Sequence, residues 1–159
     1  MQDIDLKEMY IRLNEEMFEG KLPNNIKVVW SARMTSKAAV CKYRVDYTSG
    51  IPVRTPVEIR ISKPYHKRFP EELKETLIHE MIHVKYPYDG HGIEFNREMD
   101  KLNKKFNLGI RKFSSGKAVV NFIYTCKKCE QKYERVKKIN DYYNYRCTCG
   151  GELDESKTG

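Results

Sequence analysis

The stretch from His79 to His83 has the residue types and the spacing of a metal site. It reads His-Glu-Met-Ile-His, with two histidines four positions apart. On an α-helix, positions i and i+4 lie on one face about one turn apart, so both imidazoles can reach one metal ion. Glu80 lies between them, where a carboxylate acts as general base toward a water that the metal activates. The motif predicts a zinc hydrolase; two unrelated histidines on a surface helix are the competing interpretation.

The residues before the motif predict the helix that such a site needs. Pro70, Glu71 and Glu72 are typical of a first helical turn. Apolar side chains then recur at helical spacing through the motif, which predicts a buried face. These apolar positions are Leu73, Leu77, Ile78, Met81 and Ile82. Imidazoles in an apolar helix are costly unless something binds them, and a metal ion removes that cost.

A third histidine follows after a turn that lets the chain fold back. Residues 87–90 include proline and glycine and end the first helix, and a second helical pattern runs over residues 92–106. A catalytic zinc usually has three protein ligands and leaves the fourth position to water. His91 is therefore the expected third ligand. A capping or surface role for His91 is one alternative, and Glu94 or Glu98 as the third ligand is another.

Four of the five cysteines form two pairs near the end of the chain. Cys126 and Cys129 form a CxxC pair, and after seventeen residues Cys147 and Cys149 form a CxC pair. This separation is typical of a four-cysteine structural zinc site, and the strand-like stretches around it predict a zinc ribbon. Those stretches are residues 119–124, 133–136 and 142–146. Most ribbons have CxxC on both sides, so a site with a missing ligand or weak binding is the alternative.

Cys41 and His66 lie outside these two groups. Cys41 falls inside a strand pattern and is expected to be a buried core thiol, with a regulatory contact to the catalytic zinc as the alternative. His66 lies in a Pro-Tyr-His-Lys segment that we expect to be a loop, with the histidine in solvent or facing the substrate.

The remaining periodicity predicts an α+β fold. An amphipathic helix is expected first, then three strands that precede the two metal-bearing helices, so that a small mixed or mostly antiparallel sheet packs on helices. The helix is expected at residues 3–19 and the strands at 26–30, 38–47 and 57–62.

The length of 159 residues suits one main domain with a small module. We expect the main domain at residues 1–113 and the cysteine module at 118–153. Glycine and serine make residues 109–117 the candidate linker, and residues 152–159 are expected to fray.

Positive charge is concentrated in one part of the sequence. Residues 1–100 hold 16 Lys and Arg against 16 Asp and Glu, whereas residues 101–148 hold 13 against 3. A basic block interleaved with aromatic residues predicts nucleic-acid binding, with a merely solvated surface as the alternative. The tyrosines that could stack on bases or form the core of the module are Tyr124, Tyr133, Tyr142, Tyr143 and Tyr145.

The sequence also predicts where the protein works. No segment approaches the run of about 20 apolar residues that spans a membrane. The first residues have neither the basic segment nor the apolar core of a signal peptide. We expect an intracellular, cytoplasmic protein, or one at the nucleoid or in the nucleus if it binds DNA, with cysteines as thiols or metal ligands rather than disulfides.

Together these motifs resemble the SprT-like zinc metalloprotease family, which includes the Spartan proteases of DNA–protein crosslinks. The specific part of the resemblance is the HExxH motif, the following segment from His91 to Phe95, and the paired cysteines, although the family pattern has CxxC in both pairs. Looser similarity covers residues 13–23, 29–34, 38–41 and 57–62. The resemblance implies a zincin-like domain, zinc ligation by His79, His83 and His91, Glu80 as catalytic residue, and protein substrates bound or crosslinked to DNA.

Two functions follow from different classes. The leading hypothesis is a zinc-dependent endopeptidase with one catalytic and one structural zinc ion and a basic ribbon that binds DNA. The alternative is a non-proteolytic nucleic-acid-binding or regulatory zinc protein. Glu80 favours the enzyme, because a structural zinc site has no need of a general base and is closed by a fourth protein ligand. Peptide preference, DNA form, the residue that stabilises the transition state and the oligomeric state leave no signal in the sequence.

Overall fold

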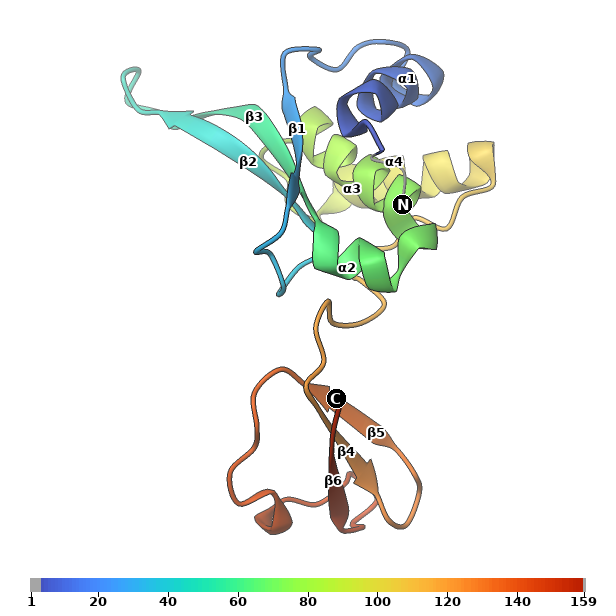
Figure 1. Cartoon of the computed structure of the whole chain (residues 1–159). Helices are drawn as coiled ribbons and strands as arrows, with labels where there is room; N and C mark the ends of the chain where they lie inside the picture. Colours follow the sequence, from blue (N-terminus) through green and yellow to red (C-terminus); the bar gives the residue numbers. More distant parts are fainter. Residues whose placement is uncertain (1–3, 159) are drawn as a thin grey trace. The chain divides into compact units, whose positions relative to one another are not determined.

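The computed structural model describes residues 4–158, which divide into two compact units between Ser115 and Gly116 (Figure 1). The first unit contains α1 (Leu6–Phe18), β1 (Lys27–Ser31), β2 (Ala39–Asp46), β3 (Val53–Ser62), α2 (Lys63–Arg68), the 3-10 helix η1 (Pro70–Glu72), α3 (Leu73–Lys85) and α4 (Ile93–Phe106). The second contains β4 (Phe122–Cys126), β5 (Lys132–Arg135), the 3-10 helix η2 (Tyr142–Asn144) and β6 (Leu153–Lys157). No helix in the described residues has the length and apolar character needed to cross a membrane.

The first unit is built on a mixed three-stranded sheet. β3 is the central strand, paired in parallel with β1 and antiparallel with β2, which leaves β2 at an edge. α3 packs against β2 and β3, α1 against β1, and α4 against α3 (Figure 1). The predicted α+β fold is confirmed. The expected first residue of α1, residue 3, lies outside the described part of the chain.

Burial of one face fixes α3 in place. Leu77, Ile78, Met81 and Ile82 have no exposed surface and pack in the core that also contains Ile59 of β3. Burying an aliphatic side chain of this size contributes about 1.5–3 kcal/mol to folding. The core therefore determines which way α3 faces, and the histidines lie on the side of the helix that borders a cleft.

The turn into α4 places His91 beside α3. The backbone N–H of Phe95 donates to Oδ2 of Asp89 over 2.8 Å, so Asp89 satisfies one of the free donors at the start of the helix. A Cβ atom at Gly92 would lie 2.5 Å from Oδ1 of the same aspartate. Only glycine fits there without displacing Asp89, which explains the His-Gly sequence at this turn.

The expected loop around His66 is wrong. Residues 63–68 form α2, and the Ser62 side chain caps it by accepting the Tyr65 N–H. His66 is buried, with its ring nitrogens 2.9 Å from the Ser62 carbonyl oxygen and 3.0 Å from Oγ1 of Thr76. Both polar atoms of the ring are therefore bound within the fold, and His66 has a structural role in α2.

The second unit is an antiparallel sheet in the order β5-β4-β6. Residues 153–157, expected to fray, instead form β6 along β4, with Leu153 in a small core beside Tyr124. Gly159, the end of the expected frayed segment, lies outside the described residues. The expected strand at 142–146 is also wrong, because η2 and one isolated bridge between Arg146 and Glu152 lie there.

Candidate metal centres

Three imidazoles converge in the first unit. The Nε2 atoms of His79 and His83 are 3.2 Å apart, those of His83 and His91 are 3.2 Å apart, and those of His79 and His91 are 3.1 Å apart. Zinc–nitrogen bonds of about 2.0–2.1 Å at tetrahedral angles separate two ligand nitrogens by about 3.3 Å. The three side chains together therefore fit a single zinc ion.

One aromatic ring supports all three imidazoles. Phe95, fully buried in the first turn of α4, has its ring centroid 4.8 Å from His79, 4.6 Å from His83 and 4.7 Å from His91. A rigid apolar ring behind the cluster restricts the histidine rotamers, so the nitrogens are held close together before a metal binds.

The imidazoles are in the protonation state that binds metals. Burial lowers the pKa of His79 and of His83 to about 4. Burial also lowers the pKa of His91, to which the positive charge of Lys112 adds. All three rings are therefore neutral near pH 7, and the neutral imidazole is the form that ligates zinc.

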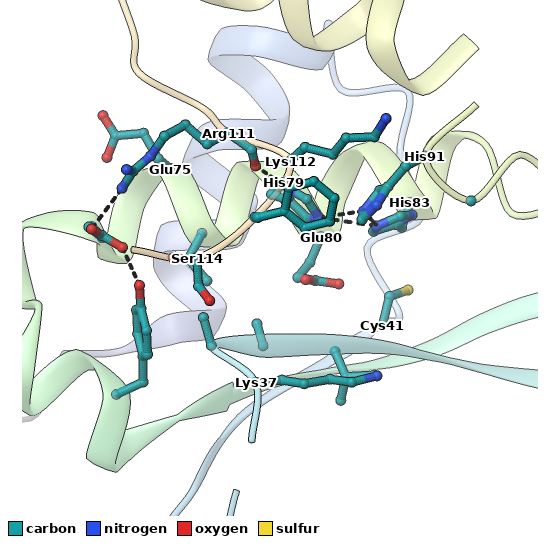
Figure 2. Close-up of a pocket in the computed structure, with 18 of the residues that line it drawn as sticks. Lys37, Cys41, Glu75, His79, Glu80, His83, His91, Arg111, Lys112 and Ser114 are labelled. Carbon is teal, nitrogen blue, oxygen red and sulfur yellow. Dashed lines mark hydrogen bonds and ion pairs between the residues drawn. The ribbon is translucent and has the colours of Figure 1, made fainter. Parts of the chain in front are cut away.

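Glu80 occupies the space between this cluster and the sheet. Its side chain extends from α3 toward β2 and Cys41 (Figure 2), and it is 6% exposed. Burial raises the pKa of Glu80 to about 8, although the backbone N–H of Cys41 donates to the carboxylate and Lys37 adds a positive charge, both of which oppose the rise. A divalent cation at the histidines would favour the ionised carboxylate further, because opposite charges stabilise one another.

A cleft of about 460 Å³ opens in front of the histidines and Glu80. β2 forms one wall, and the segment after α4 forms another (Figure 2). Glu94 and Glu98, the alternative ligands, do not join the histidine cluster. Glu94 is exposed, and Glu98 is buried with its carboxylate 2.9 Å from Nζ of Lys85.

The four paired cysteines converge in the second unit. Their Sγ atoms all lie within 4.8 Å of one another, and the Cys126–Cys149 and Cys129–Cys147 pairs are each 3.5 Å apart. Gly150, with a φ of +86°, lets the chain turn sharply after the CxC pair. The CxC pair has one residue fewer than a CxxC pair, and this difference does not prevent the four sulfurs from lying close together.

Hydrogen bonds favour the thiolate form at Cys126 and Cys147. At Cys129 the Gln131 N–H also favours the thiolate, but contacts with the sulfurs of Cys149 and Cys147 outweigh it and raise the pKa to about 12. The backbone N–H groups of Lys128 and Cys129 donate to Sγ of Cys126 over 3.3 and 3.4 Å. The Tyr133 hydroxyl lies 3.0 Å from Sγ of Cys147, and this contact, as the largest of several, lowers the pKa of Cys147 to about 6. Thiolate is the form that binds zinc, so the donor set fits a four-sulfur site.

Cys41 is buried, as expected, and it lines the cleft beside Glu80. Burial raises the pKa of its thiol to about 12, which keeps the sulfur protonated. Its backbone N–H binds Glu80. No residue pattern predicts this contact, because any residue except proline has the backbone N–H that makes it.

Two other contacts at the site also have no signature in the sequence. The Tyr43 hydroxyl donates to the His83 carbonyl oxygen over 2.9 Å, which ties β2 to α3. The carbonyl oxygen of Arg111 lies 2.8 Å from Nδ1 of His79. Ile110 is buried beside it, so the start of the expected linker at 109–117 belongs to the first unit.

The sequence model of the SprT-like family matches residues 6–115, which include all three histidines and Glu80. The chain belongs to the SprT-like family. The resemblance inferred from the motifs is thereby confirmed, while the cysteine cluster lies outside the matched region.

The SprT-like relatives include three that span a wide range of animals. The chain is 36% identical over 114 residues to the DNA-dependent metalloprotease SPRTN of Xenopus tropicalis. This alignment covers 67% of this chain and 24% of that protein. It is 36% identical over 108 residues to human SPRTN, an alignment that covers 62% of this chain and 20% of that protein. It is 34% identical over 109 residues to the DNA-dependent metalloprotease dvc-1 of Caenorhabditis elegans, an alignment that covers 63% of this chain and 28% of that protein. The alignments thus span less than a third of each relative's length.

Proposed function

We propose that this chain is a zinc-dependent endopeptidase of the SprT-like type. The observation that carries the proposal is the convergence of three imidazole nitrogens in an open cleft beside the buried carboxylate of Glu80. Within residues 4–158 this cluster has three ligating side chains, which is the ligand count of catalytic rather than structural zinc. His79, His83 and His91 would hold the ion in a zincin-like domain and leave its fourth position to water or substrate.

The division of labour follows from the donor set. Zinc bound there would supply the positive charge that activates a water and polarises a peptide carbonyl. Glu80 would take the proton from the attacking water and deliver it to the leaving amine. The Cys41 N–H orients its carboxylate. A cation at the histidines would offset the rise in pKa that burial causes, so that Glu80 is ionised and can act as the base.

An edge of the sheet could bind the substrate peptide. β2 is an edge strand, and residues 39–41 of it line the cleft. An extended peptide can pair with an edge strand and so lie across the site with its carbonyl groups held in register. This requires an unfolded stretch in the substrate, because a helical or folded segment cannot form that ladder.

We propose that the cysteine cluster is a structural zinc ribbon. The four sulfurs lie close enough together to hold one ion, and four protein ligands would leave no position for water, which is typical of structural zinc. Among the described residues of the second unit, the core cluster contains four buried residues, Tyr124, Cys126, Cys147 and Leu153. Metal ligation would supply stability that this core is too small to provide.

We propose DNA-bound or DNA-crosslinked proteins as the substrate class. The relatives are named DNA-dependent metalloproteases, and residues 101–115 carry five Lys and Arg and no Asp or Glu. In the second unit, Tyr143 and Tyr145 are 63% and 56% exposed, and the guanidinium of Arg146, which follows them, donates to their carbonyl oxygens. Exposed aromatic rings next to basic groups suit stacking on unpaired bases. Such a protein would work inside the cell, where DNA is found.

The test uses the full chain and one substrate protein in two states, crosslinked to DNA and free. With zinc present, we expect cleavage of the crosslinked form, little cleavage of the free form, loss of cleavage with a chelator, and recovery when zinc is restored. A zinc-loaded protein that binds DNA yet leaves the crosslinked substrate intact would contradict the protease and favour the non-proteolytic nucleic-acid-binding protein instead.

A further inference from the structure

A short segment after α4 touches the metal cluster through its backbone. Residues 111–115, here called the strap, pass beside α3, and the Arg111 carbonyl oxygen lies 2.8 Å from Nδ1 of His79 (Figure 2). A carbonyl oxygen only accepts hydrogen bonds, so this contact fixes the proton of the neutral ring on Nδ1. The lone pair of Nε2 is then directed at the other two imidazoles, as metal ligation requires.

One carboxylate holds the strap at both of its ends. Oε1 of Glu72 accepts from the Arg111 guanidinium over 2.8 Å and is also bonded to the Ser115 hydroxyl. Oε2 of Glu72 accepts from the Tyr65 hydroxyl over 2.5 Å, and the Ser115 N–H donates to that same hydroxyl over 3.0 Å. Tyr65 is buried, so this network is anchored in the first unit.

Glu72 stands at the start of α3 but does not cap this helix. It is the residue before α3, and its side chain makes no capping hydrogen bond there. Both carboxylate oxygens are directed to the strap and to Tyr65 instead. Glu71, next to it on η1, is exposed and provides a matched comparison of the same charge.

We propose that Glu72 is a positioning residue for the histidine site: by clamping residues 111–115, it holds the Arg111 carbonyl that fixes the ring orientation and tautomer of His79. This inference rests on the proposed function, since it assumes that the three histidines bind zinc. It predicts that Glu72, which is not one of the three histidine ligands, controls metal affinity from outside the ligand set.

The experiment measures zinc affinity of the full chain by competition with a chromophoric chelator. His79→Ala identifies which binding step belongs to the histidine site, as opposed to the cysteine site. We expect Glu72→Ala to weaken that step by about 10- to 100-fold, the usual effect of losing an outer partner of a ligand. Glu71→Ala should change it by no more than about twofold, as other exposed substitutions do. Arg111→Ala keeps the carbonyl and removes only an exposed side chain. It should weaken zinc binding at the histidine site by a smaller factor than Glu72→Ala does.

A second readout separates positioning from a loss of fold. NMR spectra that correlate the imidazole protons with both ring nitrogens reveal which nitrogen of His79 is protonated in the metal-free protein. We expect Nδ1 in the wild type and in Glu71→Ala, and a mixture of both tautomers in Glu72→Ala and, to a smaller extent, in Arg111→Ala.

The possible failures are distinguishable. If no zinc-binding step of the wild type depends on His79, the proposed function fails and the inference fails with it. If the step exists but Glu72→Ala binds zinc as tightly as Glu71→Ala, the inference alone is wrong. A weakened step with an unchanged His79 tautomer would also overturn it, because Glu72 would then act only on the fold. Should Glu72→Ala not fold, the Arg111→Ala measurements decide in the same way.

Discussion

Replacing Glu80 by glutamine should abolish most hydrolysis while leaving the metal in place. Removal of a general base costs about 100- to 10,000-fold in rate, which corresponds to about 3 to 5 kcal/mol of activation free energy. Glutamine keeps the shape of the side chain and an oxygen that can accept the Cys41 N–H. Because burial raises the pKa of Glu80 to about 8, the metal-free protein holds this carboxyl mainly protonated at pH 7, so an uncharged amide should not destabilise it.

Glu98 provides a matched control with the opposite expectation. It is 5% exposed, close to the 6% of Glu80, but its carboxylate is paired with Lys85 and lies outside the cleft. Glu98→Gln weakens a charge-assisted hydrogen bond and should lower the free energy of unfolding by about 1–2 kcal/mol. Its rate of hydrolysis should stay near that of the wild type.

The assay measures three quantities for each variant: cleavage of a DNA-crosslinked protein, zinc content after dialysis, and the free energy of unfolding in urea. The expected pattern is loss of rate with full zinc for Glu80→Gln, and loss of stability with full rate for Glu98→Gln. If Glu80→Gln cleaved within tenfold of the wild type, another group would be the base. If it lost its zinc, Glu80 would be a ligand and the assignment of His91 would need revision.

Three further outcomes are expected. Converting Cys126 and Cys129 to serine should remove one of two zinc ions and unfold residues 116–158 while the first unit stays folded, as checked by metal analysis and NMR; retention of both ions would refute the ribbon. His91→Ala should weaken zinc binding at the histidine site, and an unchanged affinity in chelator competition would give the third ligand to another residue. Reversing the charge of Lys128 and Lys137 should weaken DNA binding without sequence preference and flatten its dependence on salt, and a salt slope equal to that of the wild type would move the binding surface elsewhere.

The features that the sequence predicted are those in which each residue type has one dominant role. The apolar spacing around the HExxH motif specified a helix with one buried face, and Leu77, Ile78, Met81 and Ile82 are buried as that spacing requires. The strands β1 and β2 lie within one residue of their expected bounds, whereas β3 begins earlier, at Val53. Its first residues are exposed and pair with β2 in a hairpin, so they lack the alternation that marks a half-buried strand.

The parts that were missed depend on contacts between distant segments. α2 has only six residues and no apolar stripe, and it is stabilised by the Ser62 cap and by the bond from His66 to Thr76 on another helix. β6 is polar, but it is held by pairing with β4, about thirty residues earlier in the chain. The strap acts through a main-chain carbonyl, whose position no side-chain pattern can specify.

The tyrosines of the second unit illustrate how structure divides a single sequence signal into two roles. Tyr124 is fully buried in the core of the second unit, and Tyr133 and Tyr142 pack against that core. These three tyrosines therefore contribute to the fold. Tyr143 and Tyr145 remain exposed beside Arg146. The basic residues of the second unit also divide into two groups. The unit carries nine basic against six acidic residues, and three of the basic residues lie within 4 Å of carboxylates of their own unit: Lys127, Lys138 and Arg146. Nucleic acid would therefore meet a modest positive field with two stacking rings, which favours unpaired bases over the phosphates of a duplex as the main source of affinity in this unit.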